Sequence, residues 1–142
     1  MDLHKKPGHL IRRLNQNSTA VFSNHMQQVG LDLTPVQFAA MDVIARIPGI
    51  DQAKVAAEIG YDRATIGGVV DRLEQKGYIE RTVCKHDRRA REVRLTEKGS
   101  EVFDQVAPVV QALQADILPG LSLAERDKFI ELASKALAHI DG

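Results

Sequence analysis

The chain has 142 residues, 44% of them hydrophobic, and its 19 basic and 19 acidic side chains give a formal net charge of zero. This length and composition predict a single globular domain over residues 1–142 with a core of its own. A zero net charge argues against a protein that coats nucleic acid indiscriminately. There is no membrane-length apolar run and no signal-peptide pattern, and the single cysteine fits a reducing environment, so we expect a cytoplasmic protein.

The N-terminal third of the chain predicts two helices. Apolar residues at helical spacing indicate a long helix over residues 8–29. Thr34 then begins a second helix, because Thr34 and Gln37 have the spacing of a capping box and Pro35 suits the first helical position. This second helix is expected to run to about Arg46, before a Pro-Gly pair ends it.

Two further helices follow in close succession. Asp51 is expected to cap a short helix over residues 52–59, and Asp62 a longer one over residues 63–76. Each of them stops at a glycine. Two helices joined by three residues around a glycine match the spacing of a helix-turn-helix.

A charged hairpin is predicted after the second of these helices. The β-prone segment Tyr78–Val83 and the alternating segment Arg91–Leu95 flank a polar loop over Lys85–Ala90. Helix, turn, helix and hairpin together predict a winged helix-turn-helix over residues 34–96. The expected fold class is mainly α with a small β-hairpin.

The C-terminal third predicts two more helices. Thr96 caps a helix that runs to about Leu118, and a capping box at Ser122 and Glu125 starts a last helix to about Ile140. The terminal helices carry more apolar surface than the winged module can cover. Residues 8–30 and 97–140 are therefore expected to pack together and against a second copy of the chain.

The predicted helix over residues 63–76 has the character of a recognition helix. Apolar side chains at i, i+3, i+4 and i+7 form its buried face. The opposite face is small and polar, and we expect it to meet the major groove through Arg63, Ala64, Thr65, Gly67, Gly68 and Arg72. Two adjacent glycines cost about 1 kcal/mol each inside a helix, so they indicate either crowding by a neighbouring helix or close approach of the backbone to a groove.

Positive charge is concentrated in and around the predicted hairpin. Six basic residues lie between positions 81 and 94, namely Arg81, Lys85, Arg88, Arg89, Arg91 and Arg94. A charge run alone is usually a solvated loop. Next to a helix-turn-helix, long cationic side chains on a thin hairpin favour insertion into the minor groove, with Lys85, Arg88, Arg89 and Arg91 as contacts. Asp87 is placed to hold the Arg89 guanidinium in a fixed pose.

Several segments together resemble the MarR family of bacterial transcription regulators. The resemblance extends over nearly the whole chain in length and in the order of the helices. The matching segments are Leu33–Phe38 (LTPVQF), Asp62–Thr65 (DRAT), Val70–Arg81 (VDRLEQKGYIER), Asp87–Arg89 (DRR) and Arg94–Gly99 (RLTEKG).

The resemblance implies a homodimer held by the first and last helices, with recognition helices in adjacent major grooves of a palindromic operator. It implies that Arg89 is the wing arginine and Asp87 the acid that orients it. It further implies a repressor that is released from DNA by a small aromatic acid. The chain is similar to regulators that control the degradation of aromatic acids, including nicotinate-like acids. Candidate ligand residues are His9, Arg13, Phe22, His25, Phe38 and Met41.

Other classes of protein are less well supported by the sequence. No nucleophile elbow, phosphate-binding loop or histidine-rich metal motif indicates an enzyme, a bound cofactor or a metal site. A redox-responsive regulator would have to use Cys84, which lies in the predicted wing. A winged-helix module used only for protein contacts would not need the basic wing residues.

Overall fold

The computed structural model describes residues 1–141, and helices dominate them. Helix boundaries lie within one or two residues of those that the sequence predicts. In chain order the elements are η1 (Leu3–Lys5), α1 (Pro7–Gln28), α2 (Pro35–Arg46), β1 (Ile50–Asp51), α3 (Gln52–Ile59), α4 (Arg63–Gln75), β2 (Ile79–Val83), β3 (Arg91–Leu95), α5 (Glu97–Ile117) and α6 (Leu123–Asp141).

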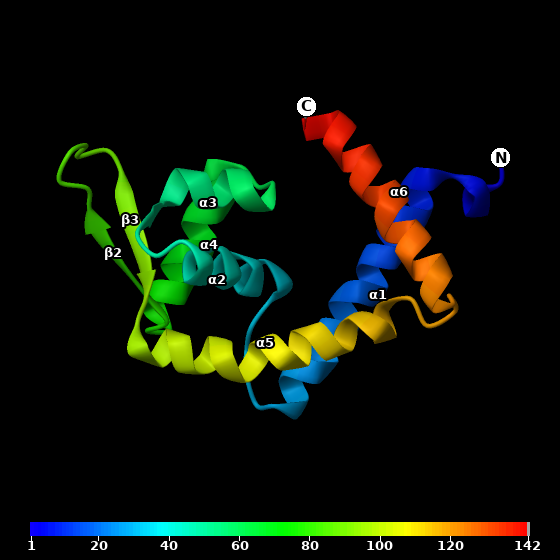
Figure 1. Ribbon diagram of the computed structural model, residues 1–142, viewed down its shortest axis with the longest axis horizontal. Helices are drawn as coiled ribbons and strands as arrows, with labels where there is room; N and C mark the ends of the chain where they lie inside the picture. The colour runs from blue at the N-terminus through cyan, green and yellow to red at the C-terminus, as the bar shows by residue number, and fades with distance from the viewer. Residues whose placement is uncertain (142) are drawn as a thin grey trace.

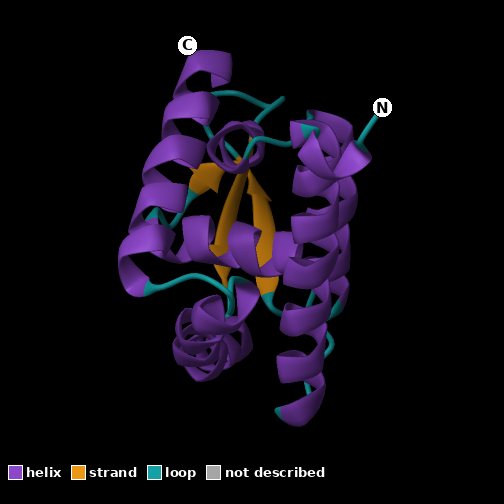
Figure 2. Ribbon diagram, turned by 90° about the vertical axis from the view of Figure 1, so that its right-hand side faces the viewer, coloured by secondary structure: helices purple, strands orange, loops and turns teal. Residues whose placement is uncertain are grey.

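The elements form two groups joined by α5 (Figure 1). Helices α2, α3 and α4 lie together with the strands at one end, and α1, α6 and both chain termini lie at the other end. Helix α5 runs from the strands toward the second group and packs along α1. Seen from the terminal end, α1 and α6 stand in front and the strands lie behind them (Figure 2). No helix in residues 1–141 is long and apolar enough to cross a membrane.

The β-structure is a three-stranded antiparallel sheet in the order β1-β3-β2, where the sequence predicted only a hairpin. Strand β1 has two residues, and Ile50 and Asp51 pair with Val93 and Glu92 of β3. The predicted hairpin of β2 and β3 is present, with Arg81 opposite Val93. Two residues are too short for an alternating pattern, so β1 could not be recognised from sequence periodicity.

One hydrophobic core extends through both groups. Helix α1 contributes Phe22 and Met26, and α5 contributes Val106 and Leu113. The remaining buried side chains come mostly from α2, α3, α4 and the sheet: Leu33, Ala40, Met41, Val43, Ile44, Ile50, Val55, Ala56, Ile66, Val69, Val70, Leu73, Tyr78, Ile79 and Val93. Helices α1 and α5 are therefore part of the same packed body as the winged module.

Most of the predicted caps are confirmed. Thr34 and Gln37 form a reciprocal capping box, and Thr96 accepts a hydrogen bond from the backbone N–H of Gly99. Ser122 and Glu125 form a second capping box at α6. The cap predicted at Asp51 is wrong. Its side chain makes no cap hydrogen bond to α3, because it instead accepts one from the backbone N–H of Arg91 across the sheet, at 3.3 Å.

Candidate nucleic-acid interface

The N-terminus of α4 is fixed by Asp62. Its carboxylate accepts hydrogen bonds from the backbone N–H and the hydroxyl of Thr65, at 2.7 and 3.0 Å. These two hydrogen bonds hold the pKa of Asp62 below its ordinary value, and the one from the Thr65 backbone has the larger effect. The Thr65 hydroxyl therefore donates its hydrogen inside the protein, and its oxygen is left to accept a bond from an outside partner.

The two faces of α4 differ as the sequence predicts. The buried face consists of Ile66, Val69, Val70 and Leu73. Five of the six proposed contacts on this helix are exposed, and the sixth, Gly67, is half-buried: Arg63, Ala64, Thr65, Gly67, Gly68 and Arg72.

The two glycines of α4 are not explained by crowding. Beyond the adjoining residues and the local backbone of α4, a Cβ atom on Gly68 would have no heavy atom within 4 Å, and one on Gly67 would meet only the amide nitrogen of Gln52, at 3.9 Å. Each glycine nevertheless costs about 1 kcal/mol relative to alanine in a helix. The packing of the chain gives no reason for this cost, whereas a partner that approaches the backbone of α4 closely would.

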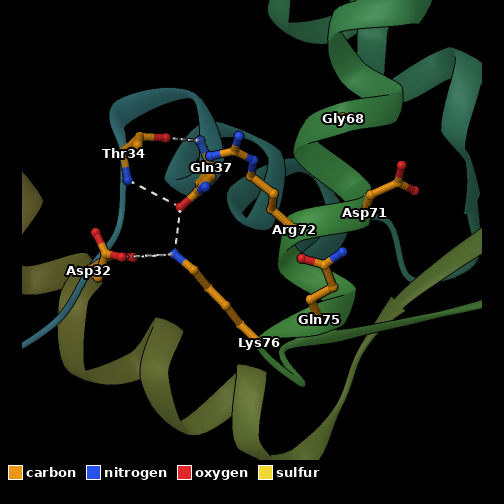
Figure 3. A pocket seen from close by; sticks show the side chains of 8 residues that line it. All are labelled: Asp32, Thr34, Gln37, Gly68, Asp71, Arg72, Gln75 and Lys76. Atoms are coloured by element: carbon orange, nitrogen blue, oxygen red, sulfur yellow. Dashed lines mark hydrogen bonds and ion pairs between the residues drawn. The ribbon is translucent and has the colours of Figure 1, made fainter.

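The outer side of α4 borders a polar cavity of about 640 Å³ whose other wall is the start of α2 (Figure 3). Within it, Arg72 extends from α4 toward Gln37, while Asp71 points to the opposite side. The cavity is lined by Asp32, Thr34, Gln37, Gly68, Asp71, Arg72, Gln75 and Lys76. Such a lining suits a hydrated or charged surface better than an apolar ligand.

The wing, defined here as residues 84–91, carries a group of exposed cations. Lys85, Arg88, Arg89 and Arg91 are all exposed. In the part of the chain that the structure describes, none of them lies within ion-pairing distance of an acidic side chain. Their charge is therefore available to an outside anion.

Asp87 acts on the wing backbone rather than on the Arg89 side chain. Its carboxylate accepts a hydrogen bond from the backbone N–H of Arg89, at 2.9 Å. The expectation that Asp87 holds the guanidinium is thus corrected, because a carboxylate two residues before an amide closes a local turn. Arg91 also fixes the loop, donating from Nη1 to the carbonyl of Arg88 at 2.9 Å.

Helix α4 and the wing meet in one cleft. A cavity of about 400 Å³ brings Arg63 of α4 together with Arg89 and Arg91 of the wing. Its other lining residues are Asp51, Gln52, Ala53, Asp87 and Ala90. Both carboxylates accept backbone hydrogen bonds from the wing, and neither forms an ion pair with the three arginines in the described residues, so the three positive charges can attract an anion such as a phosphate.

Two members of the basic cluster lie against other parts of the chain. Arg81 of β2 forms ion pairs with Asp71 at 2.7 Å and with Glu74 at 3.0 Å. The hydrogen bond between Arg81 and Glu74 lowers the pKa of Glu74 and raises that of Arg81. Arg94 lies against Gly49, where a Cβ atom would be 2.6 Å from its Nη2. Arg81 therefore ties β2 to α4, and its charge is offset by two carboxylates of that helix.

The candidate ligand residues are only partly brought together. Phe22 and Phe38 line a cavity of about 300 Å³ between α1, α2 and α5, and the Phe38 ring stacks on Phe103 with centroids 5.5 Å apart. The polar side chains of this lining are not among the ligand residues predicted from the sequence. The other lining residues are Ser18, Pro35, Ala39, Asp42, Val110, Leu113, Gln114 and Ile117.

The remaining ligand candidates lie elsewhere. Arg13 lines a separate apolar cavity of about 530 Å³ beside α6. His25 is paired with Asp116 at 3.4 Å, and His9 contacts Arg12 at 3.3 Å. Met41 is fully buried, so it belongs to the core rather than to a cleft. Helical periodicity places residues on a face, but it does not distinguish a buried position from one beside a cavity.

The terminal helices leave a broad apolar surface uncovered. Helix α6 has no buried residue within its bounds. The large apolar side chains exposed on α1 and α6 are Leu10, Ile11, Leu123, Phe129, Ile130, Leu132, Leu137 and Ile140. So many exposed apolar side chains on the terminal helices are typical of an interaction surface.

Known proteins resemble this chain over nearly its full length. A model described as the MarR family matches residues 31–90. Transcriptional regulator HosA of Escherichia coli O157:H7 is 31% identical over 137 residues, which cover 96% of this chain and 98% of HosA. Two solved structures share the fold. BpsR of Bordetella bronchiseptica, whose DNA binding is regulated by 6-hydroxynicotinic acid, has a TM-score of 0.87 at 26% identity, covering 96% of each chain.

The second solved structure is a mutant of MarR from E. coli complexed with operator DNA. It has a TM-score of 0.83 at 26% identity and covers 92% of each chain. The match in sequence to HosA, the match in fold and the winged helix-turn-helix seen here agree. The chain belongs to the MarR family of winged-helix, DNA-binding transcriptional regulators.

Proposed function

We propose that this chain is a homodimeric repressor that binds a palindromic operator and is released by a small aromatic carboxylate. In this proposal residues 34–96 form the DNA-binding lobe, and residues 8–30 and 97–140 form the dimer. Helix α4 lies in the major groove and the wing in the adjacent minor groove. The contacts are Arg63, Ala64, Thr65, Gly67, Gly68 and Arg72 on α4, and Lys85, Arg88, Arg89 and Arg91 on the wing.

The cleft that joins Arg63 to Arg89 and Arg91 is the observation that carries this proposal. Three cations from two separate elements converge there, and none of them has an acidic side-chain partner in residues 1–141. Phosphate contacts by Arg and Lys supply much of the affinity of DNA-binding proteins. The bare face of α4 beside this cleft supplies a surface that fits a groove.

Replacing Arg89 with alanine is expected to weaken binding to an operator duplex enriched from a random pool. If Arg89 meets a phosphate, the slope of log affinity against log salt should fall by about one. If it reads the minor groove, preference for A·T pairs in the flanking positions should relax. Fluorescence anisotropy over a salt series measures both. Arg94→Ala is the matched control, and equal affinity for wild type and Arg89→Ala would remove the wing from the proposal.

The exposed apolar face of α1 and α6 supports the dimer. A face of this size is unfavourable in water and is covered in a symmetric pair by its own copy. Two winged lobes carried on joined terminal helices would present two recognition helices to DNA. A spacing of about 34 Å between them corresponds to one helical turn of DNA. Because a symmetric pair has a two-fold axis, its operator is expected to be palindromic.

The cavity around Phe22 and Phe38 supports a small aromatic effector. Its volume of about 300 Å³ accommodates a single aromatic ring, and Ser18 and Gln114 can hydrogen-bond a ligand. The third polar side chain of the lining, Asp42, is paired with Arg46 at 3.1 Å, which offsets its negative charge. Since its walls come from α1, α2 and α5, a ligand there contacts both the dimer helices and the DNA-binding lobe. A ligand that binds better to another spacing of the two lobes would shift the population away from DNA. The 6-hydroxynicotinic acid that regulates BpsR is an acid of this class.

Adding benzoate or 6-hydroxynicotinate is expected to stabilise the protein and to weaken operator binding. At about 100 times its dissociation constant, a ligand adds about 2.7 kcal/mol to the free energy of unfolding. Thermal shift and anisotropy report the two effects. Ala39→Leu should fill the cavity and remove both, and benzamide should show how far the response depends on the carboxylate. If neither acid changes operator affinity, benzoate and 6-hydroxynicotinate are excluded as effectors.

A further inference from the structure

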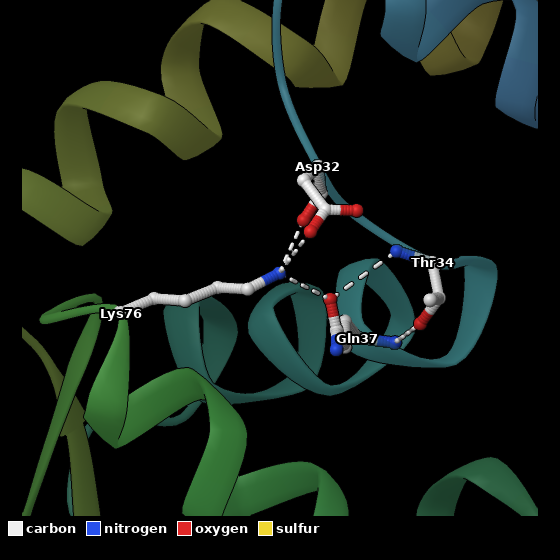
Figure 4. Close-up of polar contacts among 4 residues, drawn as sticks. All are labelled: Asp32, Thr34, Gln37 and Lys76. Carbon is white, nitrogen blue, oxygen red and sulfur yellow. Dashed lines mark hydrogen bonds and ion pairs between the residues drawn. The ribbon is translucent and has the colours of Figure 1, made fainter.

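Lys76 joins the C-terminal end of α4 to the start of α2 (Figure 4). Its Nζ donates a hydrogen bond to Oε1 of Gln37, at 3.0 Å, and another to the backbone carbonyl of Asp32. The Asp32 carboxylate lies 4.0 Å from the same nitrogen. The Lys76 side chain is 26% exposed, so it crosses between two elements instead of extending into water.

Gln37, the acceptor of this lysine, is buried, and its side-chain oxygen accepts two hydrogen bonds. It is the one polar residue among the buried residues of the described chain, at 5% exposure. The Gln37 Oε1 also accepts a hydrogen bond from the backbone N–H of Thr34, and the Gln37 backbone N–H donates one to the Thr34 hydroxyl, each at 3.2 Å. Lys76 therefore binds to a capping box whose geometry is already fixed. A charged donor makes this a strong hydrogen bond.

The backbone at the same end of α4 is held from the other side by α5. The carbonyl of Lys76 accepts a hydrogen bond from Nζ of Lys98, at 3.2 Å. The carbonyl of Gly77 accepts one from the hydroxyl of Thr96, at 2.6 Å. Helix α4 is thus fixed to α5 through its backbone and to α2 through the Lys76 side chain.

We propose that Lys76 is a positioning residue for sequence-specific DNA binding, an inference that rests on the proposed role of α4 as the recognition helix. The lysine sets the pose of α4 against α2, and Gln37 is the group through which it acts. It places the side chains of α4 without contacting DNA, because its Nζ is bound to Gln37 and Asp32. Its loss should lower affinity for the correct sequence and leave general attraction to the phosphate backbone unchanged.

The test measures affinity for the enriched duplex and for a scrambled duplex of the same composition, over a range of KCl concentrations. Lys76→Met should lose about tenfold on the enriched duplex, the equivalent of one good base contact, and keep wild-type affinity for the scrambled one. Its salt slope should not change. Lys85→Met, a wing lysine, is the control and should weaken binding to both duplexes and reduce the slope by about 0.9. Lys76→Arg should restore binding.

A double-mutant cycle tests whether Lys76 acts through Gln37. Gln37→Met should cause a similar loss on the enriched duplex, and adding Lys76→Met should cause no further loss. Additive losses, a reduced salt slope in Lys76→Met or an unchanged affinity for the enriched duplex would each overturn the inference. Failure of the wild-type chain to enrich any sequence from a random pool would instead overturn the proposed function.

Discussion

Replacing Gly68 with leucine is expected to abolish operator binding while making the fold more stable. A side chain at this position extends into open space, since no atom lies within 4 Å of its Cβ. Leucine favours helix over glycine by about 0.8 kcal/mol, so thermal stability should rise. The added side chain holds the backbone of α4 away from the groove, and affinity should fall to the non-specific level, a loss of about 1,000-fold or more.

The control for this variant is Gly8→Ala on α1, which also adds atoms at an open helical glycine. It should leave operator affinity at the wild-type value. Anisotropy with the enriched duplex measures affinity, and calorimetry at one protein concentration measures stability. If Gly68→Leu binds the enriched duplex as tightly as wild type, the face of α4 around Gly68 is not the one that enters the groove.

Replacing Gly99 with alanine is expected to cause a large loss of stability, although it adds only one methyl group. A Cβ at Gly99 would lie 1.9 Å from the carbonyl oxygen of Tyr78, an overlap with backbone that no rotamer relieves. The same carbonyl accepts a hydrogen bond from the N–H of Thr96, at 3.0 Å. Overpacking of this kind costs about 3 kcal/mol or more, which lowers the melting temperature by about 10 °C.

The same Gly8→Ala variant serves as the control, because alanine there meets no neighbouring atom. Its melting temperature should equal or slightly exceed that of wild type. Gly99→Ala should also weaken operator binding, because the displaced turn at Tyr78 directly follows the C-terminal end of α4 and would shift that helix. A wild-type melting temperature in Gly99→Ala would mean that α5 does not pack closely against this turn.

Local rules predicted the helices well because their ends depend on neighbours in sequence. Thr34, Asp62 and Thr96 each cap a helix with a partner three residues away. Asp51 failed the same rule because its carboxylate has a competing partner, the backbone N–H of Arg91, 40 residues along the chain. A pairing across the sheet is not visible to a rule that considers one turn of helix.

The run of basic residues in the sequence predicted the position of the wing, but it did not predict what each of its cations contacts. Arg81 and Arg94 belong to the same run of sequence as Arg89, yet one is paired with Asp71 and Glu74 and the other packs on Gly49. The role of Lys76 could not be predicted from the sequence because its partner, Gln37, lies 39 positions away. Whether a cation is free to bind DNA depends on partners that lie far away in the sequence, and those partners can be identified only once the fold is known.

Methylation protection by dimethyl sulfate is the most direct test of how the chain meets DNA. The reagent modifies guanine N7 in the major groove and adenine N3 in the minor groove, so it reports α4 and the wing separately. We predict two protected guanine N7 clusters about 10 base pairs apart, with protected adenine N3 positions flanking them. Arg89→Ala should lose only the adenine protection, and Gly68→Leu should lose both. Protection at adenine N3 alone, or guanine N7 protection that persists in Gly68→Leu, would contradict the proposed placement of α4 in the major groove.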